Sequence, residues 1–357
     1  MSSFTTGQTI AWLHNGAWRA DAPDLELSSR QLKSIMPSLF KTGSVGIVWP
    51  RLRHAADRYG ALGIGMEQGY AAQVEHNGKV ATEIAGLVTE MRRAGIEPVL
   101  IKGWSNSRLY PQGVIRPAGD IDLWVRAADY ERASSVIAGL AESGHSIGVD
   151  LHDNAHWKDP DPVDLHTGSA SFELEGVQVS VPCPEDHLRL SCLHFLVHEG
   201  RRPIWLCDIA LVLESRPSDF DWDRFLGKDS LRRNWIVATL GLAHQLLGAR
   251  IDDTPIFEEA QNVPAWFAPS VLKQWEAGER KHAYSTAASE VLQNPAAIGT
   301  TLRRRWPDPV RASVQCNRPF DDTPRLPIQV AAYTGLLAQY GIRRLLPQVV
   351  QYFRLSR

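Results

Sequence analysis

The segment Asp120-Ile-Asp-Leu-Trp-Val125 places two carboxylates two residues apart in an otherwise apolar run. This alternation is typical of a β-strand, in which residues two apart point to the same face. Asp120 and Asp122 are therefore expected to share one face, while the residues between and after them pack on the other. Two carboxylates on one face repel each other unless a cation lies between them, and hard oxygen ligands suit magnesium.

A second informative segment lies just before the first. Pro98-Val-Leu-Ile-Lys102 is a short apolar run that predicts a buried strand, and Gly103 follows it at the start of a short helix predicted over 104–110. Backbone N–H groups at a helix start favour anions, and glycine lets a backbone approach a ligand closely. We therefore expect a phosphate-binding turn here. Lys102 and Arg116 are candidates for neutralising phosphate charge, although solvated surface cations would look the same in the sequence.

A third acid, Asp164, lies 42 residues after Asp122 in Val163-Asp164-Leu165, again between apolar residues. We predict a short strand over 162–166. If this strand neighbours the first, three carboxylates converge on one metal site. A D-x-D pair alone occurs often on solvated edge strands, so the prediction rests on the combination of glycine turn, acid pair and third acid.

The rest of the chain has mainly helical periodicity. Predicted helices cover 28–40, 48–58, 66–94 and 127–143 in the first half, and 184–199, 204–214, 231–248 and 327–354 in the second. Residues 172–181 predict strands with a turn near Glu175-Gly176. Residues 1–27 are expected to be irregular and 290–326 to be rich in loops. These patterns divide the chain into a helical region 1–95, an α/β core 96–182, a helical region 183–250 that packs on the core, and a C-terminal helical region 251–357.

Composition restricts the functional class. The chain has 357 residues, 44% hydrophobic and 22% charged, with a net charge of -2, which is ordinary for a globular protein. The balance disfavours long nucleic acids, which call for a basic surface. Four cysteines without a C-x-x-C pair predict reduced thiols. With no signal peptide and no apolar stretch long enough to span a bilayer, we expect a cytoplasmic protein.

These motifs resemble a known family. The order of glycine turn, D-x-D strand and later aspartate resembles the nucleotidyltransferase superfamily that includes DNA polymerase beta. More specifically, the motifs resemble an uncharacterised bacterial nucleotidyltransferase family. The matching segments span about residues 85–215 and are Leu100-Ile-Lys-Gly103, Leu109-Tyr110, Arg116-Pro117, Asp120-Ile-Asp-Leu123, Pro184-Glu-Asp-His-Leu188, His194 and Trp205-Leu-Cys-Asp-Ile209.

The resemblance implies a fold of class α+β, with a mixed sheet flanked by N- and C-terminal helices. It further implies that Asp120, Asp122 and Asp164 bind Mg²⁺, or Mn²⁺ in its place, and carry catalysis, with Gly103 against the phosphates of a nucleoside triphosphate. The superfamily usually has a small residue, often serine, where this chain has Trp104. Ser105 is the candidate to take over that phosphate contact. ATP is the default donor, and neither the acceptor nor the oligomeric state can be read from these motifs.

Two other functions remain open from the sequence. His187, His194 and His198 fall on one predicted helix, with Asp208 nearby, and would suit a zinc-dependent hydrolase. However, they do not form the H-E-x-x-H pattern, and they would equally well line or brace a nucleotide pocket. The second alternative is a regulator that binds a nucleotide without turnover. His166, two residues after Asp164, is a further candidate to reach the substrate or to serve structurally.

Overall fold

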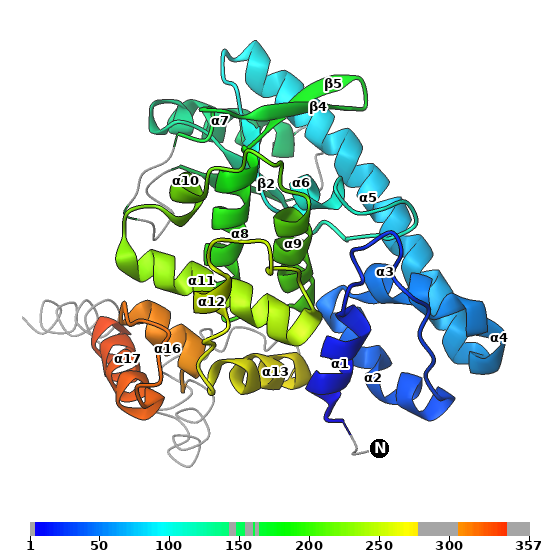
Figure 1. The fold of residues 1–357 in the computed structure, drawn as a ribbon. Coiled ribbons are helices and arrows are strands. Elements are labelled where there is room, and N and C mark those ends of the chain that lie inside the picture. The colour runs from blue at the N-terminus through cyan, green and yellow to red at the C-terminus, as the bar shows by residue number, and fades with distance from the viewer. Residues whose placement is uncertain (1–3, 143–147, 154–159, 161–163, 278–305, 341–357) are drawn as a thin grey trace, which may run out of the picture.

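The protein is an α+β structure in which one small mixed β-sheet is surrounded by helices (Figure 1). The computed structural model describes residues 4–142, 148–153, 160, 164–277 and 306–340. The predicted fold class is therefore confirmed. The sheet lies in the upper part of the view, the long helix α5 (Ala61–Arg93) runs diagonally from the top toward the lower right, and most of the other helices form a larger body below the sheet.

The sheet has five strands in the order β3-β2-β1-β5-β4. β2 pairs antiparallel with β1 and parallel with β3, β5 pairs parallel with β1, and β4 and β5 form an antiparallel hairpin. The bounds are β1 Val99–Leu100, β2 Ile121–Trp124, β3 Val149–His152, β4 Ala170–Leu174 and β5 Val177–Val181. The strands predicted over 172–181, with a turn near Glu175-Gly176, are thus found as β4 and β5.

One face of the sheet packs on helices α5 (Ala61–Arg93) and α7 (Tyr130–Glu142). Ile121, Leu123 and Val125 are at most 1% exposed and belong to one apolar cluster with residues of α5, such as Ile84. The predicted alternation of the D-x-D strand is therefore confirmed, because its apolar side chains enter this cluster. The carboxylates are left on the opposite face.

The N-terminal region differs from the sequence expectation in two places. Residues 1–27 are not irregular throughout, because α1 (Thr6–His14) begins at Thr5 with a capping box closed by Gln8. The helix predicted over 48–58 is wrong, since that stretch is split into short helical pieces around Pro50, whose ring cannot continue a regular helix. These pieces are α3 (Val45–Val48), η1 (Trp49–Arg51), η2 (Arg53–Ala55) and α4 (Ala56–Tyr59). In contrast, α2 (Ser29–Thr42) begins at Ser28, as predicted.

The second half of the chain builds the larger apolar core. Helices α8, α9 and α11 are buried along most of their length and share one cluster with α1. The positions predicted for α8, α9 and α11 are confirmed. Residues 341–354 of the helix predicted over 327–354 and residues 290–305 of the stretch 290–326 lie outside the described residues, and the described part of that stretch contains helix α16. The bounds are α8 Pro184–Val197, α9 Pro203–Glu214, α10 Trp222–Leu226, α11 Ser230–Leu247, α12 Phe257–Ala260, α13 Phe267–Ala277, α16 Pro309–Gln315 and α17 Arg325–Tyr340.

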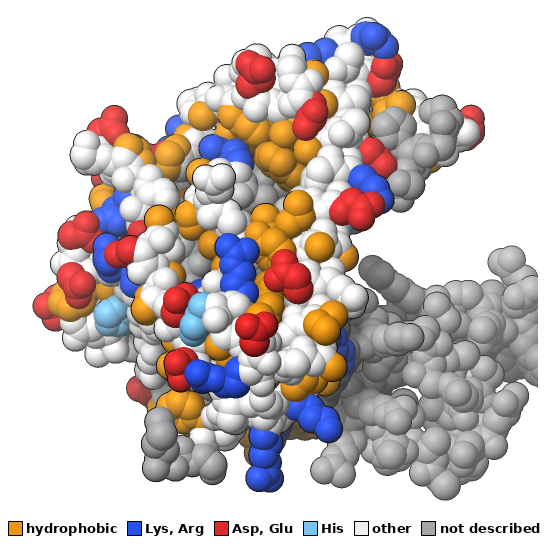
Figure 2. Space-filling model, turned by 90° about the vertical axis from the view of Figure 1, so that its right-hand side faces the viewer, with side chains coloured by type: hydrophobic (Ala, Val, Ile, Leu, Met, Phe, Trp, Pro, Cys, Tyr) orange, Lys and Arg blue, Asp and Glu red, His pale blue; other side chains and the backbone are white. Residues whose placement is uncertain are grey.

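The described helices include none that is long and apolar enough to cross a bilayer. The four cysteines are free, as predicted, and three of them are buried. On the face shown in Figure 2, lysine and arginine side chains alternate with aspartate and glutamate side chains. Such a mixed face differs from the continuous basic strip that binds a phosphate backbone.

Candidate active site

The turn from β1 into α6 (Gly103–Ser107) carries an unusual backbone. Lys102 has φ +51° and ψ -145°, a conformation that non-glycine residues rarely adopt and that costs about 1–3 kcal/mol. Gly103 follows with φ +24°. A Cβ atom added to Gly103 would lie 3.5 Å from the backbone oxygen of Asp120 and 3.7 Å from a carboxylate oxygen of Asp122. Glycine therefore leaves the space beside the acid pair open.

Asp122 is the centre of a buried charge network. Its Oδ1 lies 2.7 Å from Lys102 Nζ and 3.0 Å from His152 Nε2, and its side chain is 7% exposed. Burial alone would raise the pKa of Asp122, but hydrogen bonds from His152 and Lys102 outweigh it and hold the pKa below its usual value. Partial desolvation and the neighbouring Asp122 raise the pKa of Asp120. The surroundings of Asp122 thus favour its charged form, whereas those of Asp120 disfavour its charged form.

The third acid beside this pair comes from β3, which the sequence reading missed. Asp150 lies directly opposite Asp122 in the parallel register of β2 and β3, and His152 lies opposite Trp124. Ligand atoms of Asp122, Asp150 and His152 all lie within 4.8 Å of one another. Among the residues that the structure describes, this is the one group with the types and spacing to hold a metal ion.

Asp164 lies elsewhere. The tetrapeptide Val-Asp-Leu-His occurs twice, at 149–152 and at 163–166, and the structure uses the first copy as the strand beside the acid pair. Residues 161–163 lie outside the described part, but from Asp164 onward the chain forms a turn, so the strand prediction is wrong there. The Asp164 carboxylate accepts a hydrogen bond from the backbone N–H of His166, which favours a turn over a strand.

The surroundings of Asp164 differ from those of the acid pair. Its side chain is 46% exposed and forms an ion pair with Arg126 at 3.3 Å. His166 packs edge-on against Trp124 with 5.2 Å between ring centroids. Neither Asp164 nor His166 lines the pocket that contains Asp120 and Asp122. The sequence does contain a signal in favour of residues 149–152. They follow the helix predicted over 127–143 after a short connection, of the length usual between neighbouring elements of a compact domain.

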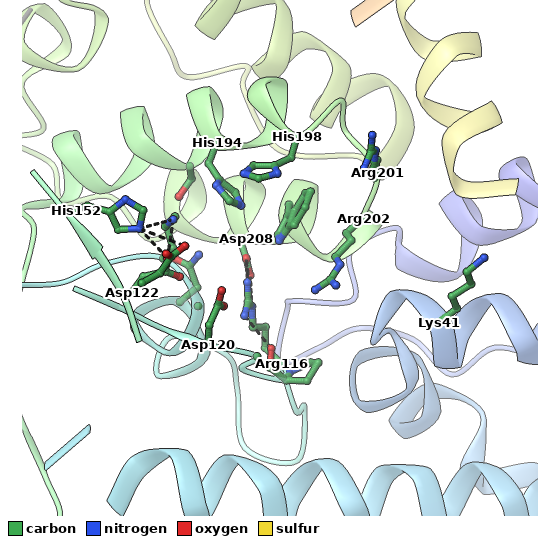
Figure 3. Close-up of a pocket in the computed structure, with 18 residues that line it drawn as sticks. Lys41, Arg116, Asp120, Asp122, His152, His194, His198, Arg201, Arg202 and Asp208 are labelled. Carbon is green, nitrogen blue, oxygen red and sulfur yellow. Dashed lines mark hydrogen bonds and ion pairs between the residues drawn. The ribbon is translucent and has the colours of Figure 1, made fainter. Parts of the chain in front are cut away.

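The pocket has a volume of about 590 Å³ and lies between the sheet and the α8–α9 helices (Figure 3). This size falls in the range of small-molecule sites. Asp120, Asp122 and His152 lie at one side, and His194 and His198 face them from α8. The lining residues are Lys41, Lys102, Gly103, Asn106, Arg116, Pro117, Gly119, Asp120, Asp122, Asp150, His152, Ser191, His194, His198, Arg201, Arg202, Trp205 and Asp208.

Of the residues predicted to contact phosphate, some line the pocket and one does not. Lys102, Gly103 and Arg116 line the pocket, whereas Ser105 is fully buried outside it. The polar residue of α6 that does line the pocket is Asn106, one helical turn after Gly103, and its Oδ1 has no hydrogen-bond partner among the described residues. A buried amide without a partner in a pocket wall is a natural ligand contact. The i, i+3 spacing from Gly103 is the sequence signal that identifies it.

Arg116 is held as a brace between the sheet side and helix α9. Its Nη2 lies 2.8 Å from Asp208 Oδ2, and Tyr110 donates a hydrogen bond of 2.9 Å to Asp208 Oδ1. Both charged side chains are at most 6% exposed. Asp208 therefore neutralises Arg116 rather than orienting a histidine, and the pair fixes one wall of the pocket to the other.

His194 and His198 form an aromatic wall with Trp205, and neither belongs to the group of possible metal ligands found among the described residues. The rings of His194 and His198 lie 4.3 Å apart, and Trp205 packs on both at 4.8 and 5.4 Å. Burial, together with the nearby Lys102, lowers the pKa of His194 well below its usual value and that of His198 to about 4. Both are therefore neutral near pH 7. His187, the third residue of the zinc alternative, is buried outside the pocket lining.

Among known proteins, a family and a solved structure match parts of this chain. No curated protein matches the chain. One solved structure that matches is an antigenic nucleotidyltransferase-like protein from Paracoccidioides brasiliensis, with 16% identity over 52% of this chain and 93% of that chain and a TM-score of 0.36. That similarity is too low to bear on function.

A family model described as "Uncharacterised nucleotidyltransferase" matches residues 43–248, more than half of the chain. The match includes the β1–α6 turn, the D-x-D strand, β3 and helices α8 and α9, and all the residues that line the pocket except Lys41. This chain therefore belongs to the family of uncharacterised nucleotidyltransferases.

Proposed function

We propose that this pocket transfers a nucleoside monophosphate from a nucleoside triphosphate to a small acceptor. The observation that carries the proposal is the group of Asp120, Asp122 and Asp150 beside the Gly103 turn in one pocket. In the reaction, an acceptor oxygen attacks the α-phosphorus, and the bond from that phosphorus to the bridging oxygen breaks to release pyrophosphate. ATP is the donor we would test first. The pocket's volume of about 590 Å³ favours a small molecule or a flexible peptide over a long nucleic acid.

The donor atoms suit Mg²⁺, or Mn²⁺ in its place. Asp122 and Asp150 offer carboxylate oxygens and His152 a nitrogen within one 4.8 Å group, and Asp120 lies on the same side of the pocket. Mg²⁺ is commonly held by one or two carboxylates together with substrate phosphates, while the imidazole nitrogen would suit Mn²⁺ better. Bound there, the ion would neutralise charge on the transferring phosphoryl group.

The chain's own groups account for the remaining requirements. Gly103 opens the backbone for close approach of the phosphates, and the amide of Asn106 faces the same space. Lys102, which lies 2.7 Å from Asp122, balances the charge of the acids and stands beside the phosphates. The neutral imidazoles of His194 and His198 close the pocket from the helical side and restrict water. Catalysis would thus come mainly from positioning and electrostatics.

Calorimetric binding of a non-hydrolysable ATP analogue, with and without Mg²⁺, tests the proposal. The wild type is compared with Asp120→Asn/Asp122→Asn and with a matched control, Asp57→Asn/Asp322→Asn, whose aspartates are exposed and lie outside the pocket. We expect Mg²⁺-dependent binding in the wild type and the control and a loss of about 100-fold in the first variant.

Equal analogue binding by all three proteins would contradict the assignment of Asp120 and Asp122 to the site.

Turnover is measured in a separate experiment, in which mass spectrometry follows the consumption of ATP in mixtures of small hydroxyl and amine acceptors. Binding without any turnover in any mixture would favour the regulator over the enzyme. Circular dichroism of each variant excludes unfolding as the cause of lost binding.

A further inference from the structure

The side of the pocket away from Asp120 and Asp122 is lined by three cations. Lys41 comes from the end of α2, and Arg201 and Arg202 come from the connection between α8 and α9 (Figure 3). Lys41 precedes Arg201 by 160 positions in the chain, and the fold brings both to the same pocket. The pocket therefore has two electrostatic ends, one anionic and one cationic.

Arg202 is held in place by an aromatic ring. Its guanidinium lies 5.5 Å from the ring centre of Trp205, which itself packs on the α8 histidines. A guanidinium over an indole face keeps its charge and most of its donors while losing conformational freedom. Arg202 is thus preorganised at the pocket surface. Lys41 has an exposed ammonium on a flexible stem, which suits a point contact with a charged ligand.

Arg201 shares the carboxylate of Glu199 with Arg311. Glu199 Oε1 lies 2.7 Å from Arg201 and 3.3 Å from Arg311. Burial and the neighbouring Glu199 raise the pKa of Asp308 well above its usual value. Glu199 stays ionised because its two arginines outweigh burial and lower its pKa. One carboxylate oxygen of Glu199 is thus shared by two guanidinium groups.

We propose that Lys41, Arg201 and Arg202 form an anion subsite that binds a phosphate group of the substrate, at the end of the pocket opposite the acids. Two sources offer this chemistry: the β- and γ-phosphates of the donor nucleotide, or a phosphate on the acceptor. Assigning the source rests on the proposed nucleotidyl transfer, whereas binding of a phosphate anion at these cations does not.

Binding of inorganic pyrophosphate in EDTA tests the subsite without any metal. The pocket variant is Lys41→Met/Arg202→Met, which removes two charges while methionine still packs on Trp205. The control is Arg30→Met/Lys33→Met, which removes two exposed charges from the same helix α2. We expect pyrophosphate binding at least tenfold weaker in the pocket variant and unchanged in the control, since the pocket variant loses two charge-assisted contacts with the anion. Equal binding by the pocket variant and the wild type, or no saturable binding by the wild type, would overturn the subsite.

A second pair of titrations, with ATP and AMP in Mg²⁺, identifies the source. Weaker ATP binding with unchanged AMP binding in the pocket variant assigns the subsite to the tail of the nucleotide. Unchanged ATP and AMP binding, with pyrophosphate binding still weakened, assigns it to the acceptor. The Asp120→Asn/Asp122→Asn variant separates the two proposals: it should still bind pyrophosphate in EDTA. A protein that binds pyrophosphate through these cations but never consumes ATP would keep the subsite and refute the transfer reaction.

Discussion

Arg116 and Asp208 form the most deeply buried ion pair at the pocket, with side chains 6% and 2% exposed. Removing one partner from such a pair leaves the other charge buried without compensation, which is far more costly than losing the pair's net attraction. Here the remaining charge would be that of Arg116, whose guanidinium also donates to the backbone oxygen of Pro117. The pair is therefore expected to contribute to stability as well as to the shape of the pocket.

We predict that Asp208→Asn lowers the free energy of unfolding by about 3–5 kcal/mol, because it strands the buried Arg116 charge. Urea denaturation followed by circular dichroism measures the change. The matched control is Asp164→Asn, which breaks the exposed pair with Arg126 and should cost less than about 1 kcal/mol. Similar losses in the two variants would contradict the bracing role of Asp208.

The repeated tetrapeptide gives a second matched test at the residue scale. Asp150→Asn and Asp164→Asn make the same chemical change in the same Val-Asp-Leu-His context. We expect Asp150→Asn to weaken Mg²⁺-dependent binding of the ATP analogue about tenfold or more, because Asp150 lies opposite Asp122, and Asp164→Asn to leave it unchanged. Calorimetry decides, and the reverse result would return the third metal ligand to Asp164.

At the scale of elements, helix α3 and the loop before Arg116 approach each other at Gly46. The backbone N–H of Ile115 donates to Gly46 O at 2.9 Å, and the N–H of Gly46 donates to Gln73 Oε1 at 2.7 Å. A Cβ atom on Gly46 would lie 2.2 Å from the backbone oxygen of Ile115. This contact ties the N-terminal helices to the loop that carries Arg116 into the pocket.

Gly46→Ala is expected to destabilise the protein by about 1–3 kcal/mol, since the backbone of the loop would have to move. Gly78→Ala, inside α5 with open space around its Cα, is expected to stabilise it by up to about 1 kcal/mol, because alanine favours a helix over glycine. Thermal unfolding of both variants provides the comparison. A stabilising Gly46→Ala would show that this loop is not fixed by the contact.

For the whole molecule, several histidines are folded into the core in their neutral form. Burial lowers the pKa of His14 to about 4 and that of His187 to about 3. The unfolded chain binds a proton at each of these histidines at about pH 6.5, whereas the folded chain does not. Their contribution to the free energy of unfolding is therefore fully present above pH 6.5 and is lost as the pH drops toward 4. His14 alone would contribute about 3 kcal/mol to this loss.

Urea midpoints at pH 7.5, 6.0 and 5.0 measure this dependence. We expect the wild type to lose stability steeply over this range, and His14→Gln/His187→Gln to lose it less steeply, because glutamine takes up no proton. The comparison between the two proteins removes the contribution of the carboxylates, which titrate in both. Parallel curves would contradict neutral burial of these two histidines.

The elements of the site that depend on local pattern could be predicted from the sequence. The alternation around Asp120 and Asp122 fixes which side chains pack, the apolar run before Gly103 fixes the strand and turn, and the capping signals fix helices such as α2. In each case, the residues that decide the structure are neighbours in the chain, so their spacing carries the information. The family resemblance and the α+β class followed from the same motifs.

Tertiary structure alone decided which distant residues meet. Two identical Val-Asp-Leu-His segments have the same local preference, and only pairing with β2 places Asp150, rather than Asp164, opposite Asp122. The approach of Asp208 to Arg116, and of Lys41 to Arg202, likewise depends on how α2 and α9 pack around the sheet. Local spacing cannot encode such contacts, because they are selected by the burial of the whole core and not by any one segment.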